Sequence, residues 1–177
     1  MRGPRLAGII KQFVNDVIWP ELDYLIVDLP PGTGDVQLTL VQTVPLTGCV
    51  AVTTPQEVAV ADAVKAVNMF LLPNVNVPIL GVVENMSWFT PEELPDNKYF
   101  LFGKGGGEKL AKKAESKLLG QVPLVQGIRE AGDDGKPIVL YTGHPSSKAF
   151  LEIADRLIES VDHRNKNFDS TKIVEVK

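Results

Sequence analysis

The sequence is poor in cysteine and histidine, the residues that build disulfide frameworks and most structural metal sites. It contains one cysteine, Cys49, and two histidines, His144 and His163, among 177 residues. One thiol excludes an internal disulfide framework and a metal site built from cysteines alone. Cys49 lies in the apolar stretch 46–52, which favours an inert thiol in the core. Neither histidine has a cysteine or histidine neighbour, so we expect neither to bind a metal.

The chain also lacks an excess of positive charge and any long apolar run. Its formal net charge is −4, which offers no electrostatic footprint for nucleic acid. No apolar run reaches the ~18 residues that a membrane span needs, and residues 1–4 do not begin a secretory signal. Apolar residues make up 44% and charged residues 23%, as in ordinary soluble domains. We therefore expect a soluble, cytoplasmic protein of one domain that binds neither nucleic acid nor membranes.

Apolar periodicity predicts alternating helices and strands. Strands are expected at residues 22–29, 49–53, 77–84 and 118–122, and three of them are apolar nearly throughout. Such strands are typical of a parallel sheet that is covered on both faces. The predicted fold class is therefore α/β, with a doubly wound, mostly parallel sheet. Helices are expected at residues 5–18, 36–44, 55–73, 108–117, 125–131 and 145–161.

The octapeptide Asp28-Leu29-Pro30-Pro31-Gly32-Thr33-Gly34-Asp35 is the most informative stretch. It follows the run expected to form the first strand, and open α/β sheets bind ligands at the carboxyl ends of their strands. A carboxylate there can hold a water on Mg²⁺ or order an attacking water, while the two glycines let backbone N–H groups approach phosphate. The alternative is a structural turn whose acidic residues, Asp35 above all, cap the next helix.

Two other nucleotide-binding motifs fit poorly. Gly32-Thr33-Gly34 follows an expected strand, but Gln37 stands where a dinucleotide fingerprint has its third glycine. In Gly103-Lys104-Gly105-Gly106-Gly107 the lysine is followed by glycine, whereas a P-loop requires serine or threonine and a preceding strand. We interpret the second stretch as a flexible lead-in to the helix expected from residue 108.

Polar residues also follow two later strands. Thr53-Thr54-Pro55-Gln56-Glu57 and Glu84-Asn85-Met86-Ser87 should lie beside Asp28 at the carboxyl edge of the sheet. The amide of Asn85 has the donor and acceptor that suit the Watson–Crick edge of a base. Turn hydrogen bonds are the plainer explanation for Asn85 and Ser87 when the residues are considered alone.

Residues 87–105 form the longest expected irregular segment. Segments of that length inside a compact domain are usually functional or mobile. Glu92, Glu93 and Asp96 cluster within it and are of the type that binds hard metal ions, although a solvated acidic loop is the favoured interpretation.

Several motifs occur in an order that resembles one known family. The chain resembles the Mrp (ApbC-like) family of P-loop ATPases, relatives of MinD, over nearly all of residues 1–160. The resemblance implies a cytoplasmic, ATP-binding carrier or scaffold of iron–sulfur clusters that acts as a homodimer and serves apo-protein or assembly partners. The motifs are the octapeptide, Gln37-Leu38-Thr39-Leu40, Thr53-Thr54-Pro55-Gln56, Asn68-Met69-Phe70, Glu84-Asn85-Met86-Ser87, Phe102-Gly103-Lys104-Gly105-Gly106-Gly107, Gly120-Gln121-Val122-Pro123-Leu124 and Asp133-Asp134-Gly135-Lys136-Pro137.

The resemblance assigns roles to individual residues. Asp28 matches the catalytic acidic residue that works with Mg²⁺, through a water, and with the attacking water. Gly32, Thr33 and Gly34 match the switch turn that senses the γ-phosphate of ATP. Asn85 and Pro123 match the pair that frames adenine.

Two departures from the family pattern matter. The phosphate-binding lysine motif of the family lies N-terminal to anything present here, so the chain resembles the C-terminal part of the ATPase domain over residues 1–161, followed by a polar tail at 162–177. The chain thus looks like a truncated gene product. Most members also carry a Cys-x-x-Cys shortly after Glu-Asn-Met-Ser, where this chain has Trp88-Phe89-Thr90-Pro91-Glu92-Glu93-Leu94-Pro95 and no cysteine.

These departures lower the activity expected of the chain. Without the lysine loop we expect poor ATP binding and negligible hydrolysis, and without the cysteine pair we expect no stable iron–sulfur cluster. We expect residues 87–105 to be a mobile or partner-contacting segment instead. The residues expected to make its contacts are Trp88, Phe89, Tyr99 and Phe100. A sheet that lacks one strand should leave an apolar edge that promotes association. The alternative function is a nucleotide-fold binding or dimerisation module without ATPase or cluster activity.

Overall fold

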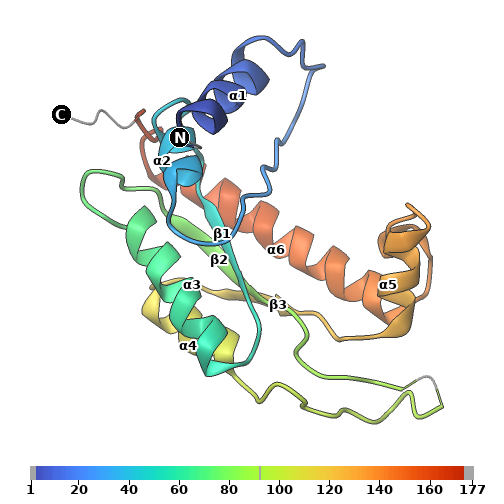
Figure 1. The fold of residues 1–177 in the computed structure, drawn as a ribbon. Helices are drawn as coiled ribbons and strands as arrows, with labels where there is room; N and C mark the ends of the chain where they lie inside the picture. Colours follow the sequence, from blue (N-terminus) through green and yellow to red (C-terminus); the bar gives the residue numbers. More distant parts are fainter. Residues whose placement is uncertain (1–2, 92, 174–177) are drawn as a thin grey trace.

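A three-stranded parallel sheet lies at the centre of the computed structural model, which describes residues 3–91 and 93–173 (Figure 1). The strands are β1 (Cys49–Thr53), β2 (Ile79–Glu84) and β3 (Leu118–Gln121), and they lie in the order β1-β2-β3. Each pair is parallel, with Thr53 opposite Glu84 and Glu84 opposite Gln121. All three strands therefore end at one edge of the sheet, as the predicted α/β class requires.

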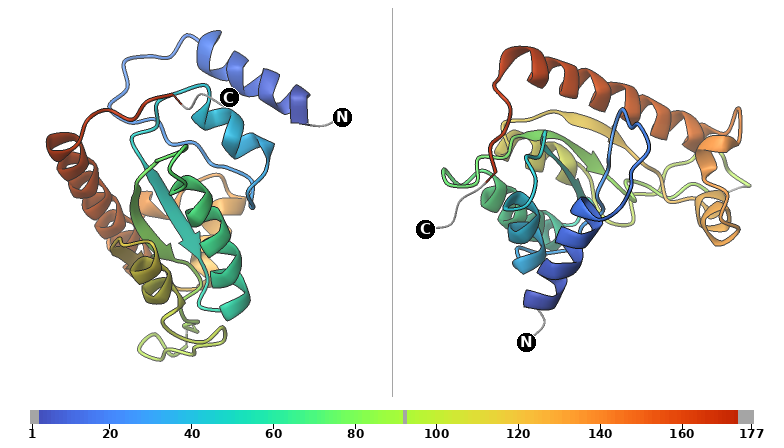
Figure 2. Two further views of the ribbon diagram at one scale, coloured as in Figure 1. Left: turned by 90° about the vertical axis from the view of Figure 1, so that its left-hand side faces the viewer. Right: turned by 90° about the horizontal axis from the view of Figure 1, so that it is seen from above.

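Helices cover both faces of the sheet, which confirms the predicted doubly wound arrangement (Figure 2). Helices α3 (Glu57–Phe70) and α4 (Gly106–Lys113) pack on the face that contains Val82. Helix α6 (Pro145–Asn167) packs on the opposite face, which contains Val83. Consecutive residues of a strand point to opposite faces, so the apolar run of β2 serves both layers. The buried contacts come from Val60, Val67, Leu110 and Ala111 on the first face, and from Leu119, Ile153 and Leu157 on the second.

Two helices precede the sheet in the chain. Helix α1 (Gly3–Asn15) packs against α2 (Asp35–Val41), at the end of the molecule where the sheet begins (Figure 1). Helix α2 is held by Val41, which is buried with Phe70, at the end of α3. Gly34 is the N-cap residue of α2 and Asp35 is its first residue, so Asp35 contributes an acidic side chain to the first turn rather than a capping hydrogen bond.

The strand expected at residues 22–29 is wrong. These residues lack strand pairing, and the side chains of residues 22–28 are exposed instead of buried, with Ile26 82% accessible; Leu29 alone is half-buried, against the cluster around Val41. A strand requires hydrogen bonds to a neighbour, and none of the described residues supplies them to this segment. The apolar sequence indicates a tendency to form a strand, but no strand of the described part of the chain pairs with this segment.

The C-terminal helix is longer than predicted. Helix α6 continues to Asn167, past the expected boundary at residue 161, so the first part of the expected tail is helical. The shorter elements α5 (Gln126–Asp133) and the 3-10 turn η1 (Ile138–Leu140) connect β3 to α6. Within the described residues, no helix combines the length and apolar character needed to cross a bilayer.

Candidate functional site

Backbone hydrogen bonds join the segments at the carboxyl edge of the sheet. The N–H of Asn85 donates to the carbonyl of Thr53 at 2.7 Å, which joins the ends of β1 and β2. The N–H of Val122 donates to the carbonyl of Glu84 at 2.8 Å, and the N–H of Ser87 donates to the carbonyl of Val122 at 3.0 Å. The segments that follow the three strands therefore have fixed positions relative to one another.

The buried side chain of Glu84 links the segments at this edge through hydrogen bonds. Its side chain is 1% exposed, and each carboxylate oxygen accepts a hydrogen bond. Oε2 accepts from the backbone N–H of Gly107 at 2.6 Å, and Oε1 accepts from Nε2 of Gln121 at 2.7 Å. The carboxylate thus connects β2 to β3 and to the start of α4, where the helix dipole favours negative charge. The sequence places Glu84 at the end of a strand and at this edge, but no local pattern shows that its carboxylate is buried.

Gly106 and Gly107, the first two residues of α4, are close-packing positions, which corrects their interpretation as part of a flexible lead-in. Helix α4 begins at Gly106, and Gly105 at its N-cap has φ = 74°. A Cβ atom at Gly106 would lie 2.7 Å from the carbonyl oxygen of Pro55. A Cβ atom at Gly107 would lie 2.7 Å from Cβ of Glu84. Only glycine lets the helix end approach the first and second strand ends this closely.

Helices α3 and α4 are also joined at their surfaces. Nζ of Lys109 forms an ion pair with the Glu57 carboxylate, in the first turn of α3. The hydrogen bond and charge of Lys109 hold the pKa of Glu57 below its usual value. Both side chains are exposed, so the pair contributes little to stability.

Asn85 and Pro123, the two residues assigned to adenine, are brought to the same edge. Asn85 directly follows β2, and Pro123 follows Val122, whose carbonyl is bound by Ser87. Oδ1 of Asn85 accepts from the N–H of Met86 at 2.9 Å, which supports the left-handed conformation of Met86 (φ = 54°). Asn85 therefore makes a turn hydrogen bond through Oδ1, as the plainer explanation from the sequence expects.

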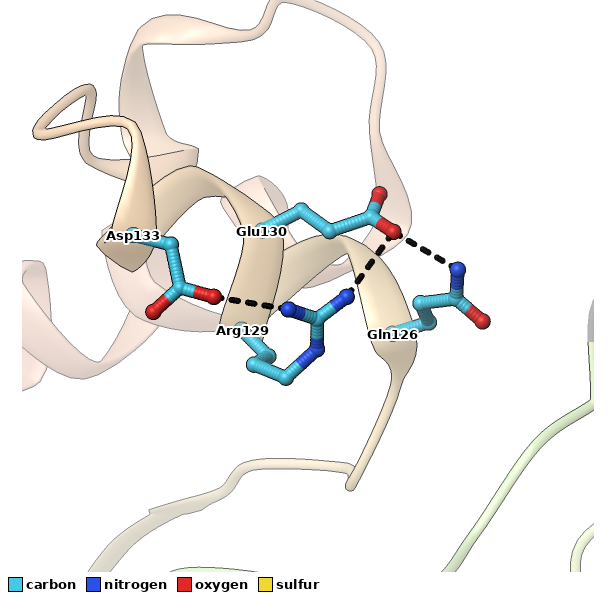
Figure 3. Close-up of polar contacts among 4 residues, drawn as sticks. All are labelled: Gln126, Arg129, Glu130 and Asp133. Carbon is cyan, nitrogen blue, oxygen red and sulfur yellow. Dashed lines mark hydrogen bonds and ion pairs between the residues drawn. The ribbon is translucent and has the colours of Figure 1, made fainter.

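A shallow hollow adjoins Pro123. It has a volume of about 360 Å³ and is lined by Phe89, Leu124, Val125, Gln126 and Arg129. On α5, the Arg129 guanidinium donates to Asp133 at 2.6 Å and to Glu130 at 3.0 Å, and Gln126 also donates to Glu130 (Figure 3). These contacts place the guanidinium on the helix surface beside the hollow. Because all the side chains involved are exposed, the ion pairs contribute little to stability.

The residues assigned to Mg²⁺ and phosphate are not brought to this edge. Asp28 lies in the exposed segment before α2, and Gly32, Thr33 and Gly34 are also exposed. The turn is held by Nε2 of Gln37, which donates to the carbonyl of Pro30 at 2.7 Å, and by the positive φ of Gly32 (104°). In the described part of the chain, no hydrogen bond or ion pair joins this turn to the carboxyl edge. Of the residues that the family resemblance singled out, Asn85 and Pro123 therefore lie at the carboxyl edge, whereas Asp28, Gly32, Thr33 and Gly34 lie in the exposed segment before α2.

Residues 87–105 form a projecting arm whose base is ordered by pairing (Figure 1). Phe89 and Tyr99 exchange backbone hydrogen bonds of 2.8 and 2.9 Å, and the N–H of Leu124 donates to the carbonyl of Trp88 at 2.7 Å. Nζ of Lys98 lies 3.9 Å from the centre of the Trp88 ring. Trp88 and Phe89 are half-buried by these contacts, so Tyr99 and Phe100 are the exposed aromatic residues of the arm. Glu92 lies outside the described residues.

Cys49 is half-buried at the start of β1, beside the apolar cluster around Val41 and Phe70. Burial raises the pKa of its thiol to about 11, so the thiol stays protonated at neutral pH. This agrees with the inert thiol expected from the sequence. Within the described residues, no group of three or more His, Cys, Asp and Glu side chains has the spacing of a metal site.

A larger cavity than the hollow beside Pro123 lies at the opposite end of the sheet. It has a volume of about 1180 Å³ and extends from the first residues of β2 and β3 to the segment 168–173 beyond α6. The ligands of open α/β sheets bind at the carboxyl ends of the strands, so size alone does not make this cavity the functional site.

Comparison with known proteins identifies what the chain is similar to. Residues 1–158 match the sequence model of the ParA family, described as NUBPL iron-transfer P-loop NTPase. The chain is 55% identical over 161 residues to an iron-sulfur cluster carrier protein of Synechocystis, covering 90% of this chain and 45% of that protein. It is 49% identical over 160 residues to the Pyrococcus furiosus carrier, covering 90% of this chain and 53% of that protein. The chain thus spans about half the length of the curated relatives it matches.

Solved structures show the same fold. An Archaeoglobus fulgidus nucleotide-binding protein in complex with ADP superposes with a TM-score of 0.67 at 36% identity, covering 80% of this chain and 56% of that one. The cell-division ATPase MinD of Pyrococcus furiosus superposes with a TM-score of 0.57 at 22% identity, covering 89% of this chain and 58% of that one. The second likeness bears on the fold alone.

Proposed function

Because this chain belongs to the ParA family of NUBPL-type iron-transfer P-loop NTPases, we propose that it is the C-terminal part of an ATP-dependent iron–sulfur cluster carrier of the Mrp type. The observation that carries the proposal is the 55% identity to a carrier protein over nine-tenths of the chain. The whole carrier would be a cytoplasmic homodimer that hydrolyses ATP and passes clusters, its cargo, to apo-proteins.

The chain's own contribution to nucleotide binding would be adenine recognition. Asn85 and Pro123 are fixed by the backbone bonds between the strand ends, and the hollow beside Pro123 offers apolar walls from Phe89 and Leu124. Pre-ordered walls of this kind favour a planar base, because little conformational entropy is lost on binding. The Nδ2 group of Asn85 would donate to a ring nitrogen acceptor of the base.

The phosphate side of the site does not fit a bound Mg-ATP in this arrangement. The Asp28 carboxylate is a suitable ligand for Mg²⁺ through water, but it is exposed and unattached to the carboxyl edge. The glycines of its turn have the freedom to approach phosphate, yet they face solvent. This observation favours the second candidate for the chain alone, a nucleotide-fold binding or dimerisation module without ATPase or cluster activity.

Calorimetric titration with Mg-ATP tests the proposal. We expect no micromolar binding by the 177-residue chain, because the lysine loop that would supply most of the phosphate-binding energy is not in the sequence. Fusing the N-terminal half of the Synechocystis carrier to this chain should restore binding. Micromolar binding by the chain alone would refute the assignment as a C-terminal part, and failure of a folded fusion to bind would refute the nucleotide site.

Asp28→Ala in the same fusion separates catalysis from base recognition. We expect hydrolysis to be abolished while ADP affinity changes less than about threefold, because the carboxylate acts on Mg²⁺ and water rather than on adenine. Asp23→Ala is the matched control, since Asp23 is an exposed acidic residue of the same segment. An equal loss of hydrolysis and ADP binding would assign Asp28 a structural role.

A further inference from the structure

Both ends of the arm formed by residues 87–105 are attached to one buried residue. Where the arm leaves β2, Oγ of Ser87 donates to the carbonyl of Glu84 at 2.9 Å. Just after the arm returns, at the start of α4, the N–H of Gly107 donates to Oε2 of Glu84 at 2.6 Å. Ser87 and Glu84 are each 1% exposed, so both hydrogen bonds are shielded from water. The backbone and the side chain of Glu84 therefore hold the two ends of the arm.

Glu84 also holds the segment that leads to Pro123. The N–H of Val122 donates to the carbonyl of Glu84 at 2.8 Å, and Nε2 of Gln121 donates to its Oε1 at 2.7 Å. Pro123 follows these two donors directly in the chain, and Asn85 directly follows Glu84. Hydrogen bonds to one residue thus set the positions of the arm and of both residues assigned to the base.

The arm itself forms one wall of the hollow beside Pro123. Phe89 and Leu124 both line that hollow, and they form a parallel β-bridge with each other. The N–H of Leu124 donates to the carbonyl of Trp88 at 2.7 Å, and the N–H of Thr90 donates to the carbonyl of Leu124 at 3.4 Å. A displacement of the arm would therefore move Phe89 and change the width of the hollow.

We propose that Glu84 is a positioning residue for base recognition, which holds the arm wall and the strand ends at a fixed separation. The inference rests on the proposed nucleotide site, because it concerns how that site keeps its shape. Glu84 acts on the base only through Asn85, Pro123 and Phe89. A carboxylate suits this role because its two oxygens accept from donors on two sides, and such charge-assisted bonds are stronger than neutral ones.

Acrylamide quenching of Trp88 tests the attachment of the arm without nucleotide. The chain has two tryptophans, so Trp19→Phe leaves Trp88 as the single reporter. Glu84→Ala should raise the quenching constant about threefold, because an unattached arm opens more often and exposes its half-buried indole. Glu84→Gln keeps an acceptor for Gly107 and should stay within about 1.5-fold of the wild type. Circular dichroism confirms that each variant is folded during the measurement.

Two further variants separate positioning from a general loss of stability. Met69→Ala removes a buried side chain from the cluster around Val41, at the end of α3, and should leave the quenching constant unchanged although it also destabilises the fold. Glu84→Asp keeps the charge but is one methylene too short to reach both donors, so it should raise the constant about twofold even where Glu84→Ala fails to fold. Wild-type quenching in the folded Glu84 variants would overturn the proposal, as would an equal rise in Met69→Ala.

Kinetics of the fusion with the N-terminal half of the Synechocystis carrier test the link to the base. Glu84→Ala should raise KM for ATP about tenfold while kcat stays within about twofold, because contacts to the base stabilise the ground state and the transition state alike. Glu84→Gln should restore KM to within about threefold of the wild type. A fusion that hydrolyses ATP with the same KM in wild type and Glu84→Ala would overturn the inference and leave the proposed function standing. A folded wild-type fusion that binds no nucleotide would instead overturn the proposed function, and with it any role of Glu84 beyond the arm.

Discussion

Glu84→Ala is expected to destabilise the chain by about 3 kcal/mol, because it leaves one buried and one half-buried donor without an acceptor. The N–H of Gly107 and the Nε2 group of Gln121 both donate to this carboxylate, which is 1% exposed. Each unsatisfied buried group costs roughly 1–3 kcal/mol, and the lost side chain adds a small cavity. Urea unfolding followed by circular dichroism would show a lower midpoint with an unchanged slope.

Two matched variants show whether burial is the cause. Glu84→Gln keeps an acceptor for Gly107, and rotation of the Gln121 amide lets that residue accept from the new donor, so we expect a loss of only about 1 kcal/mol. Glu57→Ala removes a carboxylate that pairs with Lys109 at the surface, and we expect no measurable change. Equal midpoints for Glu84→Ala and Glu57→Ala would show that the Glu84 network does not stabilise the fold.

Periodicity predicted the helices and three of the strands because those elements bury their apolar faces against neighbours within this chain. Val82 and Val83 illustrate this, since each packs under a different helical layer. The segment 22–29 has an equally apolar sequence, but none of the described residues pairs with it, so the same signal gave a wrong strand. The local apolar pattern of a segment indicates its tendency to form a strand. A strand also needs a neighbouring strand to accept and donate its backbone hydrogen bonds.

Some positions of the candidate site could be predicted from the sequence and others could not, for a similar reason. Asn85 and Pro123 follow strands that exist, so their placement at the carboxyl edge could be predicted from topology alone. Asp28 was placed by the same rule on a strand that did not form. The role of Gly106 could not be predicted, because its constraint is the carbonyl of Pro55, about fifty positions away in the sequence.

The thiols of the chain are too few and too buried to hold an iron–sulfur cluster. Iron–sulfur clusters are normally held by four cysteine thiolates. A twofold dimer of this chain offers two thiols, both Cys49, and burial raises the pKa of that thiol to about 11. A protonated, half-buried thiol in a strand is a poor ligand. The stretch 88–95, where most family members carry their cysteine pair, contains no cysteine here, and the nearby carboxylates prefer hard ions.

Anaerobic reconstitution with iron and sulfide is therefore expected to leave the chain without a stable cluster. After desalting, the visible absorption bands of a cluster should be absent, and the iron content should be the same for wild type and for Cys49→Ser. A useful positive control is a variant with Pro91→Cys and Leu94→Cys, which introduces a Cys-x-x-Cys spacing in the arm; a dimer would then present four arm thiols besides the two of Cys49 and should gain the bands. A stoichiometric cluster on the wild-type chain that disappears with Cys49→Ser would overturn the prediction, because it would require Cys49 to leave its buried position in β1 and ionise. Retention of a cluster by Cys49→Ser would overturn it differently, by requiring ligands that are not thiolates.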